Sequence, residues 1–195
     1  MTRRAAALAV IGLLFLAGCG DDEGEGGSVS APSFDAVLPS GWTEGDDSDV
    51  DNATELATQG AATALDISAD ELNLEAEAVW FGSEADDFRT NINVLAEEIP
   101  PGLDEDKYVE VALGAVTALP GIEDLEDLDP TQVDGEDAES IEYAAAPTGQ
   151  DLRFRAVALV HNGLGFNITV SASESEFDDA SDDLDEILAS WEWTD

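Results

Sequence analysis

The last third of the chain contains four strand-like runs separated by short turns, and this arrangement restricts the possible folds more than any other feature. The runs cover residues 125–133, 136–146, 152–161 and 164–173. Two of the connectors are Asp134-Gly135 and Asn162-Gly163. Asp-Gly and Asn-Gly favour the positive backbone angles that two-residue hairpins require. The sequence therefore predicts an antiparallel meander.

Helices and further strands are predicted before and after this meander. Residues 34–38 and 89–99 alternate between the two faces of a strand, with Ile92 and Val94 opposite Asn93 and Leu95. Residues 46–51 are too acidic to pack and are expected to form a loop. Capping signals and apolar spacing predict helices over 52–65, 68–80 and 104–119, and a last helix capped by Ser175. Strands that are adjacent in sequence, with helices around them, indicate an α+β fold.

Several segments resemble the PsbP-like superfamily, which includes bacterial lipoproteins of the LpqN type. They are FDAVLPSGW, FRTNINVLAEEIP, VDGEDAESIEY, GLGFNITVSA and ILASWEW. The resemblance implies a single domain over 33–195, an αβα sandwich whose twisted, mainly antiparallel sheet is flanked by helices. It also implies a non-enzymatic interaction module, with no shared catalytic residues.

The N-terminus has the pattern of an exported lipoprotein. Arg3 and Arg4 precede an apolar run over 5–15, which is too short to span a bilayer. The following Leu16-Ala17-Gly18-Cys19 resembles a bacterial lipobox. We therefore expect residues 1–18 to be a signal peptide, Cys19 to carry lipid, and 19–32 to form a disordered acidic tether. The alternative is an ordinary signal peptide that contains a cysteine.

This pattern predicts that the protein lies on the extracytoplasmic face of the cell membrane, held there by the lipid on Cys19. The export route, Sec or twin-arginine, is left open by the sequence. Cys19 is the only cysteine, so no disulfide is expected.

The chain is extremely acidic. It has 46 Asp and Glu against 6 Lys and Arg, a formal net charge of −40. Loss of Arg3 and Arg4 with the signal peptide would leave 4 − 46 = −42. This charge disfavours nucleic acid as a partner, whereas basic proteins or cations remain possible. The acids are spread along the chain, which favours a solvated coat suited to high salt, and a monomer is expected.

Neither a catalytic centre nor a metal site is predicted. His161 is the only histidine, and no Gly-x-Ser-x-Gly elbow accompanies it. Asp47, Asp49 and Asp51 match the first ligand positions of a calcium loop, but Asn52 stands where that loop requires glycine. We therefore expect no enzyme activity, no catalytic residues, no metal ligands and no cofactor.

Arg153 and Arg155 are half of the basic residues that would remain after cleavage. Strand alternation places them on the face that also carries Val157 and Leu159. The two interpretations are cross-strand pairing with acids such as Glu139 or Glu142, and a patch that binds anions.

Two functional hypotheses follow from the sequence. The first is a protein-interaction or scaffolding lipoprotein that holds a protein partner in the cell envelope. The alternative is a carrier for a small apolar or amphipathic ligand, in a pocket lined by Trp42, Trp80 and Phe166. These aromatic residues also fit an ordinary core, so the ligand-binding residues are unknown from the sequence.

Overall fold

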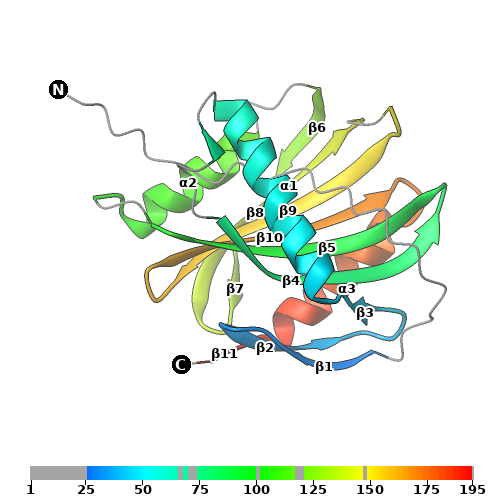
Figure 1. Ribbon diagram of the computed structural model, residues 1–195, viewed down its shortest axis with the longest axis horizontal. Coiled ribbons are helices and arrows are strands. Elements are labelled where there is room, and N and C mark those ends of the chain that lie inside the picture. The colour runs from blue at the N-terminus through cyan, green and yellow to red at the C-terminus, as the bar shows by residue number, and fades with distance from the viewer. Residues whose placement is uncertain are drawn as a thin grey trace.

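The computed structural model describes residues 26–65, 68–69, 74–99, 102–116, 121–146 and 149–194. The described chain forms three layers (Figure 1). An eight-stranded antiparallel sheet lies in the middle, with the strand order β3-β4-β5-β10-β9-β8-β6 and with β7 paired to β8. Helices α1 and α2 cover one face of this sheet. Helix α3 and a small sheet of order β1-β2-β11 cover the other face.

The elements have the following bounds. The helices are α1 (Asp47–Leu65), α2 (Glu105–Val116) and α3 (Phe177–Ala189). The strands are β1 (Gly27–Ser30), β2 (Phe34–Leu38), β3 (Thr43–Glu44), β4 (Leu74–Ala85), β5 (Phe88–Glu98), β6 (Ile122–Asp127), β7 (Thr131–Val133), β8 (Glu136–Ala145), β9 (Leu152–His161), β10 (Leu164–Ser173) and β11 (Glu192–Trp193).

The predicted α+β fold and its antiparallel meander are confirmed. Strands β8, β9 and β10 pair consecutively, while the run over 125–133 is divided between β6 and β7. The turn residues adopt the positive φ angles that the sequence predicts, 44° and 89° at Asp134 and Gly135, and 49° and 81° at Asn162 and Gly163. Local turn chemistry thus determines this part of the fold.

The helix expected over 68–80 is wrong where the structure describes it, because β4 begins at Leu74. A bulge between Ala76 and Ala78 shifts the register against β5. One extra residue places Ala76 and Val79 on the same face, where both pack under α1. The bulge therefore gives a strand the three-residue spacing that is typical of a helix.

The acidic loop expected over 46–51 is also wrong, because α1 begins at Asp47. The Asp46 carboxylate caps the helix by accepting hydrogen bonds from the backbone N–H groups of Ser48 and Asp49. The Asp49 carboxylate accepts one from the Asp46 N–H in return. The hydrogen bonds that the Asp46 carboxylate accepts lower its pKa. The largest contribution comes from a bond donated by the Ser48 hydroxyl. Acids in a first helical turn are favoured by the helix dipole.

The sequence predicted helices α2 and α3 close to their observed positions. Asp104 caps α2 by accepting a hydrogen bond from the N–H of Lys107. The cap expected at Ser175 is wrong, since α3 follows Glu176 without a side-chain cap and the Ser175 hydroxyl donates to Asp86 instead.

The small sheet adds a strand that the sequence did not predict. Residues 27–30 were expected to belong to the disordered tether, but they form β1 and pair with β2, with Val29 opposite Ala36. Val29 is buried against the core because it points inward from this strand. Cys19 and the predicted signal peptide lie outside the described residues. None of the described helices is long and apolar enough to cross a membrane.

The largest core lies between the central sheet, α3 and the small sheet. Phe34 stacks on Trp191 with a centroid distance of 3.8 Å. Trp42, Trp80 and Phe166 all belong to this core and are at most 3% exposed. The three aromatic residues proposed as pocket lining are therefore packed core residues.

Candidate ligand-binding site

The central strands β5 and β10 carry a row of polar side chains on the face that α1 and α2 cover. Alternation along the two strands directs the side chains of five residues to this face. Thr169 pairs with Asn93, and Ser171 pairs with Asn91. We call the following five residues the polar strip: Asn91, Asn93, Asn167, Thr169 and Ser171. Each of them is at most 2% exposed.

The polar strip runs between two apolar regions. On one side it adjoins β4, where Phe81 and Val79 pair with strip residues and pack under α1. On the other side it adjoins β9, where Phe154 and Ala156 pair with strip residues and pack under α2. The strip therefore lies where the apolar area under one helix gives way to the area under the other.

The amide nitrogens of the polar strip are bonded to the protein. Asn91 Nδ2 donates to the Arg89 carbonyl (3.2 Å), and Asn93 Nδ2 donates to the Thr169 carbonyl (3.4 Å). Asn167 Nδ2 donates to the Tyr108 hydroxyl at 3.1 Å.

The side-chain oxygens of the polar strip have no such partners. Asn91 Oδ1, Asn93 Oδ1, Asn167 Oδ1, Thr169 Oγ1 and Ser171 Oγ are buried and receive no hydrogen bond in the described part of the chain. A buried polar atom without a partner costs about 1–3 kcal/mol, and native proteins satisfy nearly all of them. These five oxygens have no donor among the described residues, and O–H or N–H groups of a bound molecule or of water would satisfy them.

Tyr108 closes one end of the strip. Its ring lies over Gly165, where an added Cβ would be 2.0 Å from Tyr108 Cζ. Burial, and then the negative charge of Glu97, raise the pKa of Tyr108. Its hydroxyl, which bonds to both Glu97 and Asn167, therefore stays neutral at any physiological pH.

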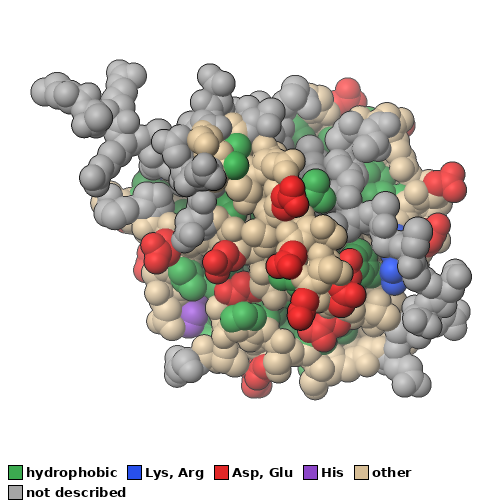
Figure 2. All heavy atoms as spheres, in the orientation of Figure 1, with side chains coloured by type: hydrophobic (Ala, Val, Ile, Leu, Met, Phe, Trp, Pro, Cys, Tyr) green, Lys and Arg blue, Asp and Glu red, His purple; other side chains and the backbone are tan. Residues whose placement is uncertain are grey.

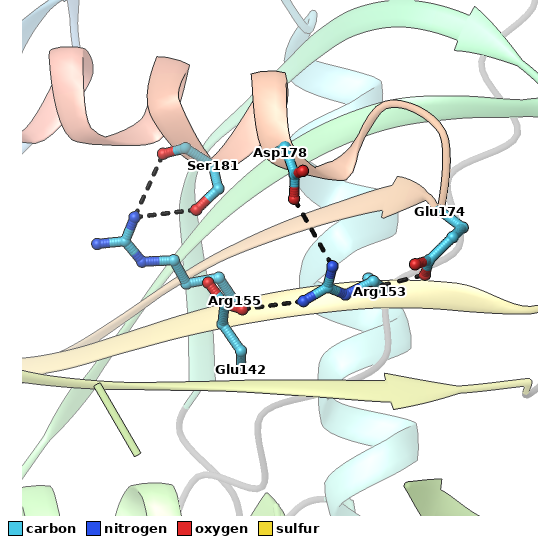
Figure 3. A network of polar contacts seen from close by, with 6 residues as sticks. All are labelled: Glu142, Arg153, Arg155, Glu174, Asp178 and Ser181. Carbon is cyan, nitrogen blue, oxygen red and sulfur yellow. Dashed lines mark hydrogen bonds and ion pairs between the residues drawn. The ribbon is translucent and has the colours of Figure 1, made fainter. Parts of the chain in front are cut away.

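The structure favours pairing over an anion patch for Arg153 and Arg155. Arg153 contacts the carboxylates of Glu142 (3.1 Å), Asp178 (3.7 Å) and Glu174 (3.9 Å), as Figure 3 shows. Arg155 is 8% exposed and donates to Ser181 and to Asp185, the latter at 2.7 Å. Of the two expected partners Glu142 is used. Both guanidinium groups thus attach α3 to the sheet.

The histidine and the aspartates considered as candidate site residues are held by contacts within the fold. His161 Nδ1 lies 2.8 Å from a carboxylate oxygen of Glu136, and its ring stacks on Trp193 at 4.2 Å. Asp47, Asp49 and Asp51 lie in the first turns of α1 and not in a loop. In the described ranges no group of three or more His, Cys, Asp or Glu side chains is arranged to hold a metal ion.

A second, smaller feature is an acidic hollow of about 200 Å³ between α3 and the edge of the large sheet. The buried Trp42 forms part of its wall and donates from its indole N–H to Asp183 at 2.7 Å. Glu176 and Asp179 add negative charge, and Thr90 also lines the hollow. The carboxylates of the hollow would attract a positively charged group.

The polar strip was visible in the sequence but was not interpreted as a site. The segments NIN in β5 and NITVSAS in β10 alternate polar and apolar residues. In a two-layer protein such a polar face would be solvated. The position of both strands at the centre of a sheet with covered faces is what buries it, and only the topology reveals this.

Comparison with solved structures identifies the type of fold. No protein-family model matches the chain, and no curated protein matches it. The chain is similar to LpqN of Mycobacterium tuberculosis, described as involved in cell envelope biogenesis, with 12% identity and a TM-score of 0.61 over 87% of this chain and 91% of that one. It is also similar to PsbP of the cyanobacterium Synechocystis sp. PCC 6803, with 15% identity and a TM-score of 0.50 over 91% of this chain and 98% of that one. The fold is therefore PsbP-like, of the LpqN type.

Proposed function

We propose that the protein is a lipid-anchored component of the cell envelope that binds a small molecule without carrying out a reaction on it. The observation that carries this proposal is the row of unpartnered oxygens in the polar strip. Amide and hydroxyl side chains bind hydrogen-bond donors, and they do not exchange protons near neutral pH. Their chemistry thus suits recognition better than acid–base catalysis.

The anchor is supported by the lipobox-like sequence that ends at Cys19. Attachment at this residue would hold the domain at the extracytoplasmic membrane face. The description of LpqN as a protein of envelope biogenesis agrees with such a location. A Cys19→Ser variant should leave the membrane fraction and appear unacylated by mass spectrometry, and retention of the acyl mass would contradict the proposed anchor.

Native mass spectrometry tests the binding function directly. The full chain would be released from membranes of its own cells at high salt, and its mass compared with that of the sequence plus acyl groups. A stoichiometric additional mass in the range of a small molecule is expected. A bare mass, together with no mass gain after incubation with the cell's small-molecule extract, would refute a ligand in the strip.

Two threonine variants provide a matched control. Thr169→Val removes an unpartnered strip hydroxyl, and it should reduce the additional mass. Thr54→Val removes a hydroxyl outside the strip that accepts a hydrogen bond from the Ala76 N–H at 2.9 Å. This control should retain the ligand. Equal loss in both variants would indicate a general effect on folding.

A protein partner is the second candidate function, favoured by the acidic hollow around Trp42. Its carboxylates would pair with a Lys or Arg side chain of an envelope protein. A photo-crosslinker at exposed Ser83 should then capture one discrete protein, and Asp179→Asn should weaken that capture. Unchanged capture by Asp179→Asn would exclude the hollow as the contact.

A further inference from the structure

Arg89 differs from the other basic residues of the domain. Lys107 pairs with Glu110, and Arg153 and Arg155 pair with the acids described above. Arg89 makes no ion pair with any carboxylate in the described part of the chain. This is unexpected in a protein with 46 acidic residues. Figure 2 shows how acidic side chains are spread over the face that α1 covers.

The nearest acid along the sheet does not neutralise Arg89. Glu84 pairs with it across the β4–β5 hairpin, but the Glu84 side chain is exposed and forms no ion pair with it. The half-buried guanidinium therefore keeps its charge available at the surface of the sheet.

Neutral groups hold the Arg89 side chain in place. Its Cζ lies 4.7 Å from the centroid of the Phe81 ring. Nη2 donates to the Thr43 hydroxyl at 3.3 Å, and Nε donates to the Gly82 carbonyl at 3.5 Å. These bonds use two of the five N–H donors of a guanidinium. A positioned arginine with donors to spare is the usual receptor for a carboxylate or a phosphate.

Arg89 stands at the end of the polar strip. It lies two residues before Asn91 on β5, so the two side chains leave the same face about 7 Å apart. The Asn91 amide also donates to the Arg89 backbone carbonyl. The guanidinium lies over Phe81 of β4, which pairs with Asn91, so a positive group flanks the Asn91 end of the strip on its β4 side.

We propose that Arg89 binds the anionic group of the ligand, a carboxylate or a phosphate, while hydroxyl or amide donors of the same molecule reach the polar strip. This inference rests on the proposed ligand-binding function. The protein's net negative charge opposes any anion at long range. Recognition must therefore come from the short-range contact with Arg89, which makes this residue essential for the preference for an anionic ligand.

Five simple probes separate the two parts of this site. Glycerol 3-phosphate and glycerate combine an anion with hydroxyl donors, phosphate and acetate are anions alone, and glycerol has donors alone. With the full chain in detergent, we expect one of the combined probes to bind at least about tenfold more tightly than each of its parts. The better of the two combined probes identifies the anion as phosphate or carboxylate.

The side-chain Nε–H resonances of arginine report the contact itself. The chain has only five arginines, so the signal of Arg89 can be assigned by its absence in Arg89→Gln. It should shift and saturate with the combined probe, whereas the signals of Arg153 and Arg155 should not. Arg89→Gln should reduce the affinity to that for glycerol, Arg89→Lys should weaken it about tenfold, and Arg153→Gln should leave it unchanged.

The outcomes separate this inference from the proposed function. If the probes bind, Thr169→Val weakens them and the Arg89 signal does not move, the strip binds ligand and the assignment of Arg89 is wrong. If no probe binds and the wild type carries no additional mass even after incubation with the cell's small-molecule extract, both proposals are wrong. If no probe binds but Thr169→Val loses the natural ligand and Thr54→Val keeps it, the strip binds a ligand and the assignment of its anionic group to Arg89 is wrong. An equal shift of all arginine signals would show nonspecific anion contact and would also overturn the assignment.

Discussion

Replacing Thr169 by valine should stabilise the ligand-free protein, although the residue is buried at the centre of the large sheet. Threonine and valine have nearly the same shape. Thr169 is 2% exposed, and its hydroxyl has no hydrogen-bond partner among the described residues. An unpaired buried hydroxyl costs about 1–3 kcal/mol, and a methyl group in its place incurs no such cost. We expect the free energy of unfolding to rise by about 1 kcal/mol, which corresponds to about 2–4 °C in Tm for a chain of this length.

Urea and thermal unfolding of the ligand-free chain at constant high salt would measure this effect. Thr54→Val serves as the control, because it removes a hydroxyl that is bonded to the Ala76 N–H and should destabilise the protein by about 1 kcal/mol. Saturating ligand should reverse the order of Thr169→Val and the wild type. Destabilisation by Thr169→Val without ligand would refute the reasoning, since it would mean that buried water already satisfies the hydroxyl.

Three further predictions concern the scaffold. Gly165→Ala should destabilise the fold by about 1–3 kcal/mol in urea unfolding, because the new Cβ would overlap the Tyr108 ring; an unchanged midpoint would show that Tyr108 can move aside freely. The pKa of Asp46 is lowered in the folded protein, so its ionised side chain stabilises α1 above the ordinary carboxyl pKa, and this contribution is lost as the pH falls through the folded pKa. Asp46→Asn should therefore flatten the dependence of Tm on pH below pH 4. An unchanged slope would contradict the role of Asp46 as a cap. Raising NaCl or KCl should increase Tm equally, because both screen the net charge of −40, and a difference between the two salts at equal ionic strength would indicate specific ion binding.

The sequence predicted elements best where local chemistry decides the structure. Asp134-Gly135 and Asn162-Gly163 fix their turns through positive φ angles alone, so the β7–β8 and β9–β10 hairpin turns could be placed residue by residue. The prediction failed at β4, where a bulge imitates helical spacing, and a bulge depends on pairing with β5. It failed at α1 because the cap at Asp46 outweighs the repulsion among the acids that follow it.

The candidate site could be predicted only in part for a related reason. Alternation placed Asn93 on one face of its strand together with Leu95, but burial of that face depends on strand order and on both helix layers. Arg153 and Arg155 stood out in the sequence because they are half of the basic residues that would remain after cleavage. Arg89 is distinguished only by what surrounds it in three dimensions, namely Phe81 and Thr43 and no acidic partner among the described residues.

The two outer strands of the large sheet also bear on how the protein behaves at high concentration. At one border β3 is only two residues long and pairs with β4 at Trp80 and Phe81. Next to it, the Val79 carbonyl and the Ala76 N–H of β4 are already bonded to the Gly45 N–H and the Thr54 hydroxyl, which leaves less backbone for another chain to pair with. At the other border β6 carries Glu123, Asp124, Glu126 and Asp127, and its register is broken between Glu123 and Glu126, where Asp124 has φ of 50°. Concentrated salt would screen the charges along β6, but the kink and the short length of β3 do not depend on ionic strength. The edges of the large sheet thus keep a geometric barrier to fibril growth under the conditions that remove the electrostatic one.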